Sequence, residues 1–106
     1  MSKQVNNLTV EVVEIQGHCP VYRVGDRFQI QDGYKLAADQ PLCMHALQSL
    51  CPYYLPLSRG ISPAEFGLAG PDGAAYVQCL DPYRFTGGGT VTFRLTQTDK
   101  HSNVSS

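Results

Sequence analysis

The apolar residues of this chain fall into four short segments with the two-residue period of β-strands and one segment with the period of a helix. Two strand-like segments, 8–15 and 27–31, come first, and two more, 74–80 and 91–95, come last. The helical segment lies between the two pairs, so there are too few helices for the crossovers of a parallel sheet. The pattern therefore predicts a small α+β fold, in which a mostly antiparallel sheet or a partial barrel is covered by one central helix.

The first strand-like segment changes phase in its middle. Its alternation of apolar and polar side chains is interrupted at Val12 and Val13. A β-bulge or a strand that is buried on both faces would produce this interruption.

The central helix is predicted from its cap and from one apolar face. Pro41 at the first helical position introduces the segment 42–50. At about 100° per residue, one face of this helix carries Cys43, Ala46, Leu47, Leu50 and Tyr54. Pro52 lacks an amide donor, so we expect the helix to end or kink there.

A single helical turn is expected after this helix. Ser62-Pro63-Ala64-Glu65 has the form of a capping box with proline at the first helical position, and Gly67 closes it.

The length and charge of the chain limit what it does. A chain of 106 residues with a net charge of −1 has room for one core and lacks the basic surface that nucleic acid requires. No apolar stretch reaches the length of a membrane span, and the polar N-terminus has no signal-peptide pattern. We therefore expect one cytoplasmic domain over residues 1–97, a disordered polar tail over residues 98–106, and no nucleic-acid or membrane partner.

Four cysteines, Cys19, Cys43, Cys51 and Cys79, are the main chemical signal of the chain. The cytoplasm keeps thiols reduced, so disulfides are not expected. The spacings do not match the paired knuckles of a structural zinc site. Thiolates from a turn, a helix and a strand end still bind zinc or iron when the fold brings them together, which makes Cys19, Cys43 and Cys79 candidate metal ligands.

A structural role competes with each of these chemical roles. Cys43 and Cys79 project from predicted buried faces, where cysteine is a small apolar residue. Cys19 lies in a turn beside His18, whose imidazole would activate the thiol if the two side chains converged. Neighbouring side chains in an extended segment point apart, so a structural role for Cys19 remains open.

A polar set follows the third strand. Asp81, Tyr83 and Arg84 supply an acid, a phenol and a guanidinium directly after Cys79. Such groups line small-molecule pockets, although Asp-Pro also begins ordinary turns. Gly87, Gly88 and Gly89 are then expected to form a hairpin loop into the fourth strand.

Taken in order, these motifs resemble those of an uncharacterised family of small bacterial and archaeal single-domain proteins. The resemblance covers roughly residues 8–95 and rests on Gly-x-Cys-Pro at 17–20, Val-Gly-Asp at 24–26, Leu-Cys at 42–43 and Val-Gln-Cys-x-Asp-Pro at 77–82. It implies that Cys19, Cys43 and Cys79 matter more than Cys51. The chain departs from the family pattern at Leu80 and in lacking tryptophan.

Three functional hypotheses follow. The first is a site lined by Cys19, Cys43 and Cys79 that binds a small molecule or a thiophilic metal, with ligand contacts from Tyr83 and Arg84. The second is an enzyme in which Cys19 is the nucleophile or acid/base group, assisted by His18 and Asp81, and acts on an anionic small substrate. The third is a homo-oligomeric interaction module with core cysteines, which uses the apolar segment 53–57 as an exposed patch or a pocket wall.

Overall fold

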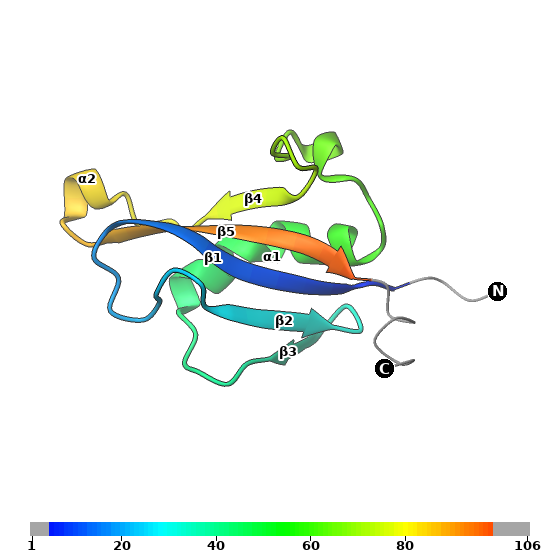
Figure 1. The fold of residues 1–106 in the computed structure, drawn as a ribbon, viewed down its shortest axis with the longest axis horizontal. Helices are drawn as coiled ribbons and strands as arrows, with labels where there is room; N and C mark the ends of the chain where they lie inside the picture. Colours follow the sequence, from blue (N-terminus) through cyan, green and yellow to red (C-terminus); the bar gives the residue numbers. More distant parts are fainter. Residues whose placement is uncertain (1–4, 99–106) are drawn as a thin grey trace.

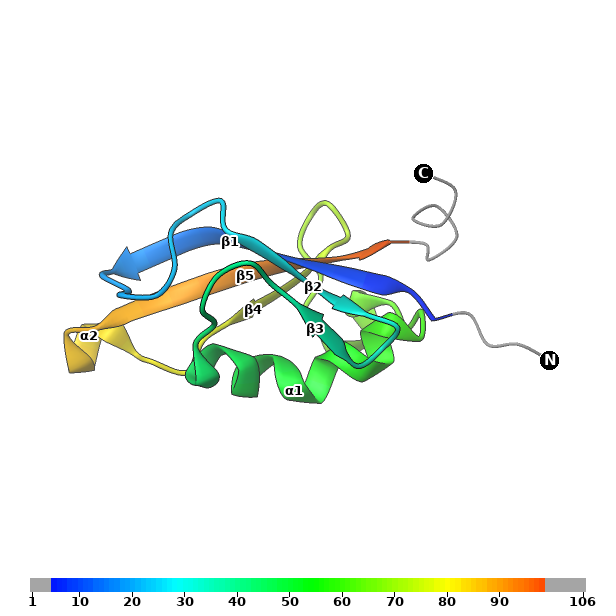
Figure 2. The ribbon, with the colours of Figure 1, turned by 90° about the horizontal axis from the view of Figure 1, so that it is seen from below.

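A computed structural model, which describes residues 5–98, shows one open five-stranded antiparallel sheet in the order β3-β2-β1-β5-β4. Helix α1 lies along one face of this sheet (Figures 1 and 2). The predicted α+β class, with an antiparallel sheet and one covering helix, is confirmed, and the sheet is not closed into a barrel. The elements are β1 (Asn7–Gly17), β2 (Arg27–Gln31), β3 (Lys35–Ala37), α1 (Met44–Ser58), the 3-10 helix η1 (Pro63–Phe66), β4 (Ala75–Gln78), α2 (Tyr83–Thr86) and β5 (Gly89–Thr98).

The two long strands β1 and β5 form the centre of the sheet, and the predicted bulge interrupts their pairing. Val12 pairs with Phe93 and Glu14 with Thr92, so Val13 is the extra residue on β1. The bulge is confirmed. It lets Val12 and Ile15, which differ by an odd number of residues, both contribute to the core.

The hydrophobic core lies between the sheet and α1. Phe93 is completely buried at its centre, with the ring of Tyr22 at 5.4 Å and that of Phe28 at 6.4 Å, both edge-on. The other fully buried large apolar side chains come from β1, β5 and α1; they are Leu8, Val10, Val12, Val91, Leu50 and Leu57. Three sequence-distant segments therefore hold one another in place.

Helix α1 is longer than the sequence suggests. It begins at Met44 with Cys43 as its N-cap, and it runs through Pro52 to Ser58. The helix therefore does not end at Pro52, which was one of the two outcomes expected there. A proline removes one backbone donor, but Leu50 and Leu57 on the flanking turns are buried against the sheet, and this packing keeps the helix intact.

Two short elements were not visible in the sequence pattern. Strand β3 has only three residues and a single large apolar side chain, Leu36, which is too little for a periodicity. Helix α2 is a single turn before Gly87, where a plain hairpin loop was expected. The expected single turn at η1 is confirmed, and the Ser62 hydroxyl accepts a hydrogen bond from the Ala64 N–H. Strand β5 reaches Thr98, and the rest of the predicted tail lies outside the described residues.

Candidate functional site

The connection between β1 and β2 holds Cys19 in a tight turn. Its sulfur accepts hydrogen bonds from the backbone N–H groups of Val21 and Tyr22, both at 3.4 Å. The two contacts fix the direction of the Cys19 side chain within the turn. The Cys19 side chain is half-buried and packs against the core, so its position is set by the fold as well as by the turn.

A pocket of about 520 Å³ opens beside this sulfur. It is lined by Ile15, Gly17, His18, Cys19, Pro20, Val21, Tyr22 and Arg23. The exposed side chains of His18 and Arg23 give it two basic groups, and its volume suits a small molecule. We refer to this space as the Cys19 pocket.

Tyr22 connects the Cys19 pocket to the beginning of α1. Its ring is buried against Phe93, and its hydroxyl accepts a hydrogen bond of 3.0 Å from the backbone N–H of Cys43. Burial raises the pKa of the Tyr22 hydroxyl, and this effect outweighs the opposite effect of the hydrogen bond from the Cys43 N–H. Sequence analysis missed Tyr22, although its position three residues after Cys19 is where a cysteine turn presents a backbone donor to sulfur.

Cys79 has the properties of a core residue. It is 7% exposed, its sulfur accepts the Val91 N–H at 3.2 Å, and its thiol lies 3.6 Å from the Gly89 carbonyl oxygen. A thiol with both a donor and an acceptor as partners is satisfied inside the core. Gly89 also packs against the backbone of His18 and Cys19, since an added β-carbon there would lie 2.6 to 2.9 Å from them. Cys79 and the Cys19 turn therefore contact the same glycine.

The polar set after β4 holds α2 in place. The Asp81 carboxylate accepts hydrogen bonds from the Thr86 hydroxyl and from the Gly89 N–H, the latter at 3.4 Å. The Tyr83 ring lies against Gly17, and the Arg84 side chain is exposed. Among residues 5–98, the side chains lining the Cys19 pocket do not include these three.

The cysteines thus occupy different environments. Cys19 and Cys43 are half-buried, and each forms a hydrogen bond with Tyr22. Cys79 is buried, and Cys51 is exposed on α1. In the part of the chain that the structure describes, no three His, Cys, Asp or Glu side chains are grouped as a metal site. Over the same residues, no helix has the length and apolar character to cross a membrane.

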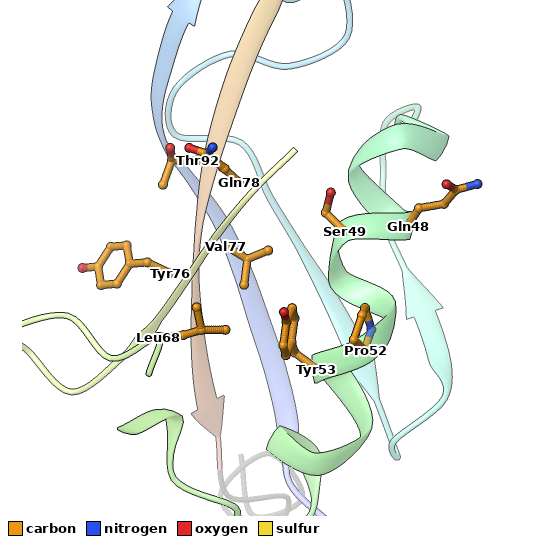
Figure 3. Close-up of a pocket in the computed structure, with 9 residues that line it drawn as sticks. All are labelled: Gln48, Ser49, Pro52, Tyr53, Leu68, Tyr76, Val77, Gln78 and Thr92. Carbon is orange, nitrogen blue, oxygen red and sulfur yellow. The ribbon is translucent and has the colours of Figure 1, made fainter. Parts of the chain in front are cut away.

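A second pocket, of about 550 Å³, separates α1 from β4 (Figure 3). Tyr53 forms part of its wall and packs edge-on against Phe66 at 5.8 Å between ring centres. Within the segment 53–57, Leu55 is exposed, Leu57 is buried, and Tyr54 lines a smaller apolar pocket beneath β3. Both tyrosines are therefore pocket walls, which was one of the two roles expected for this segment.

Comparisons with known proteins give no further guide to the site. No protein-family model, curated protein or solved structure matches the chain.

Proposed function

We propose that this protein binds a small thiophilic ligand in the Cys19 pocket, through the sulfur of Cys19. The observation that carries the proposal is the pair of backbone N–H groups, from Val21 and Tyr22, that point at this sulfur from the wall of a pocket. A cysteine sulfur held at the wall of a pocket is placed to bind a soft metal or to react with an electrophile.

The remaining groups of the pocket indicate the kind of ligand. His18 and Arg23 place exposed basic side chains at the pocket, whereas Ile15 and Val21 add apolar surface. A small anionic molecule with an apolar part and a thiol-reactive or thiol-binding group fits this mixture. A zinc or iron ion bound through the Cys19 sulfur is a second form of the same proposal.

An enzyme is the alternative that the same sulfur favours. In that case Cys19 would be the nucleophile, His18 would exchange protons, and the substrate anion would be held by Arg23. Asp81 would only hold α2 and the start of β5 in place, because its carboxylate accepts hydrogen bonds from the Thr86 hydroxyl and the Gly89 N–H. A cytoplasmic location and self-association remain parts of the proposal.

The test compares the alkylation rates of Cys19 and Cys51. Protein purified anaerobically without an affinity tag is analysed for bound metals, and the rate at which iodoacetamide alkylates each cysteine is followed by peptide mass spectrometry. Cys51 is more exposed than Cys19, so exposure predicts faster reaction at Cys51. We expect Cys19 to react faster, because its sulfur is held at the wall of a pocket, where it is placed to react with an electrophile.

Matched variants decide between the forms of the proposal. Stoichiometric zinc or iron that is lost in Cys19→Ser and kept in Cys51→Ser would support the metal form. A metal-free protein in which Cys19 is the fastest thiol would support binding or catalysis of an electrophilic small molecule. A metal-free protein in which Cys19 reacts no faster than Cys51 would refute the proposal.

A further inference from the structure

The outer edge of β4 is paired over only part of its length. On its inner side β4 pairs with β5, where Val77 is opposite Phe93. On its outer side the Tyr76 N–H donates to the Leu68 carbonyl at 3.0 Å, and the Gly70 N–H donates to the Ala74 carbonyl at 2.9 Å. The segment before β4 therefore covers the first half of the edge.

This outer pairing stops at Leu68. In a continued ladder the Leu68 N–H would donate to the Tyr76 carbonyl, but it donates to the Pro63 carbonyl at 3.2 Å instead. The residues before Leu68 form η1, and no other strand of residues 5–98 lies outside β4. Because Cys79 donates its N–H inward to Val91, the backbone of Gln78 points outward. Leu68 still lies opposite Tyr76, so the open part of the edge begins at Val77 and presents both backbone groups of Gln78.

The pocket between α1 and β4 adjoins this open edge. Figure 3 shows Val77 and Tyr53 pointing toward each other across it, with Ser49 on the helix above. Leu68 and Pro52 add apolar surface. The pocket of about 550 Å³ thus has a strand edge on one side and a helix on the other, which is a geometry that receives an extended peptide.

We propose that β4 binds an extended peptide segment of a partner protein, which adds to the sheet as an antiparallel sixth strand. One peptide residue exchanges two backbone hydrogen bonds with Gln78, and the next residue lies opposite Val77, before the position opposite Tyr76 that Leu68 occupies. The side chain of that next residue lies on the same face as Val77 and enters the pocket. It is apolar, because Val77, Tyr53 and Leu68 form part of the pocket lining.

A second copy of the chain fits this edge less well than a peptide. Pairing of β4 with β4 would share only the short stretch from Val77 to Gln78, because the segment 68–70 occupies the rest of the edge. A stable dimer buries about 1,200 Å² or more, which so short a strand pair does not supply. A single peptide strand also reaches into the pocket, where a second sheet edge would meet α1.

The test uses a seven-residue synthetic peptide of alternating valine and threonine with a lysine at each end, titrated into the full-length ¹⁵N-labelled protein. We expect the NMR signals of β4 and of the facing side of α1 to shift saturably, and hydrogen exchange of the Gln78 amide to slow. Gln78→Pro removes the backbone donor at this outward position, and Gln78→Ala keeps it. Loss of that donor should weaken binding about tenfold in the proline variant alone.

A modified peptide keeps the test informative if the proline variant does not fold. Methylating the backbone nitrogen of the central peptide residues removes donors from the ligand instead, and it should weaken binding to the unmodified protein. No saturable shift at about 2 mM peptide, equal binding by both Gln78 variants or shifts located elsewhere would refute the proposal. A Gln78 amide shift that depends on protein concentration without peptide would show that the occupant is a second copy, and would also refute it.

Discussion

Replacing Tyr22 with phenylalanine tests how the Cys19 turn is attached to helix α1. The substitution keeps the ring that packs edge-on against Phe93 at 5.4 Å and removes only the hydroxyl that accepts the Cys43 N–H at 3.0 Å. The variant loses one hydrogen bond and leaves a half-buried N–H at the helix start without its acceptor. We expect a loss of about 1.5 kcal/mol in the free energy of unfolding, which lowers Tm by roughly 8 °C in a domain of this size.

Urea unfolding of Tyr22→Phe and of the matched control Tyr34→Phe measures this loss. Tyr34 is 72% exposed, so removal of its hydroxyl should change stability by less than about 0.5 kcal/mol. Equal stability of the two variants would refute the reasoning, because the Tyr22 hydroxyl would then contribute no more than an exposed one. A changed slope of free energy against urea would indicate an altered unfolded or native state instead.

The pH dependence of the same variant supplies a second measurement. Burial raises the pKa of Tyr22 in the folded protein above its value of about 10 in the unfolded chain. As the pH rises past 10, the unfolded phenol loses its proton first, so the wild-type protein loses stability that the phenylalanine variant keeps. The stability difference between the two proteins should therefore shrink above pH 10. A constant difference would contradict the buried position of the hydroxyl.

Two further predictions concern the ends of the sheet. Gly17→Ala should destabilise the protein by roughly 2 kcal/mol or more, because the added β-carbon would lie 2.4 Å from the Gly88 carbonyl oxygen. Thermal unfolding should show a smaller effect for the control Gly87→Ala, because Gly87 also has a positive φ but has open space around it. An equal loss of stability in the two variants would show that only the backbone angle φ matters. The Arg94 guanidinium lowers the pKa of Asp72 to about 2, so this pair stabilises the fold above pH 4 and ceases to do so as the pH falls toward 2. In acid unfolding, Asp72→Asn should therefore lose less stability over that pH range than the wild-type protein. An acid unfolding profile that is the same in both proteins would refute the contribution of the pair.

The sequence contained enough local information to predict most of the fold. The change of phase at Val12 and Val13 predicted either a bulge or a strand buried on both faces, and the structure has the bulge. The pattern at Ser62 predicted the single helical turn that follows. These features are set by neighbouring residues, through side-chain period and capping chemistry. The continuation of α1 past Pro52 was not predictable in this way, because the burial of Leu57 against the sheet decides it.

The sequence also determined part of the candidate site, and the tertiary structure determined the rest. The residue types alone determined that thiol chemistry is available, and the helical period left Cys51 out of the apolar face of the helix. Only the tertiary structure decided that Tyr22 joins the Cys19 turn to Cys43, that Cys79 is satisfied within the core, and that Asp81 holds α2 rather than lining the pocket. It also decided that the edge of β4 stays open beside α1. These contacts join segments far apart in the chain, and their geometry depends on how the sheet, the helix and the loops pack together, which no local pattern encodes.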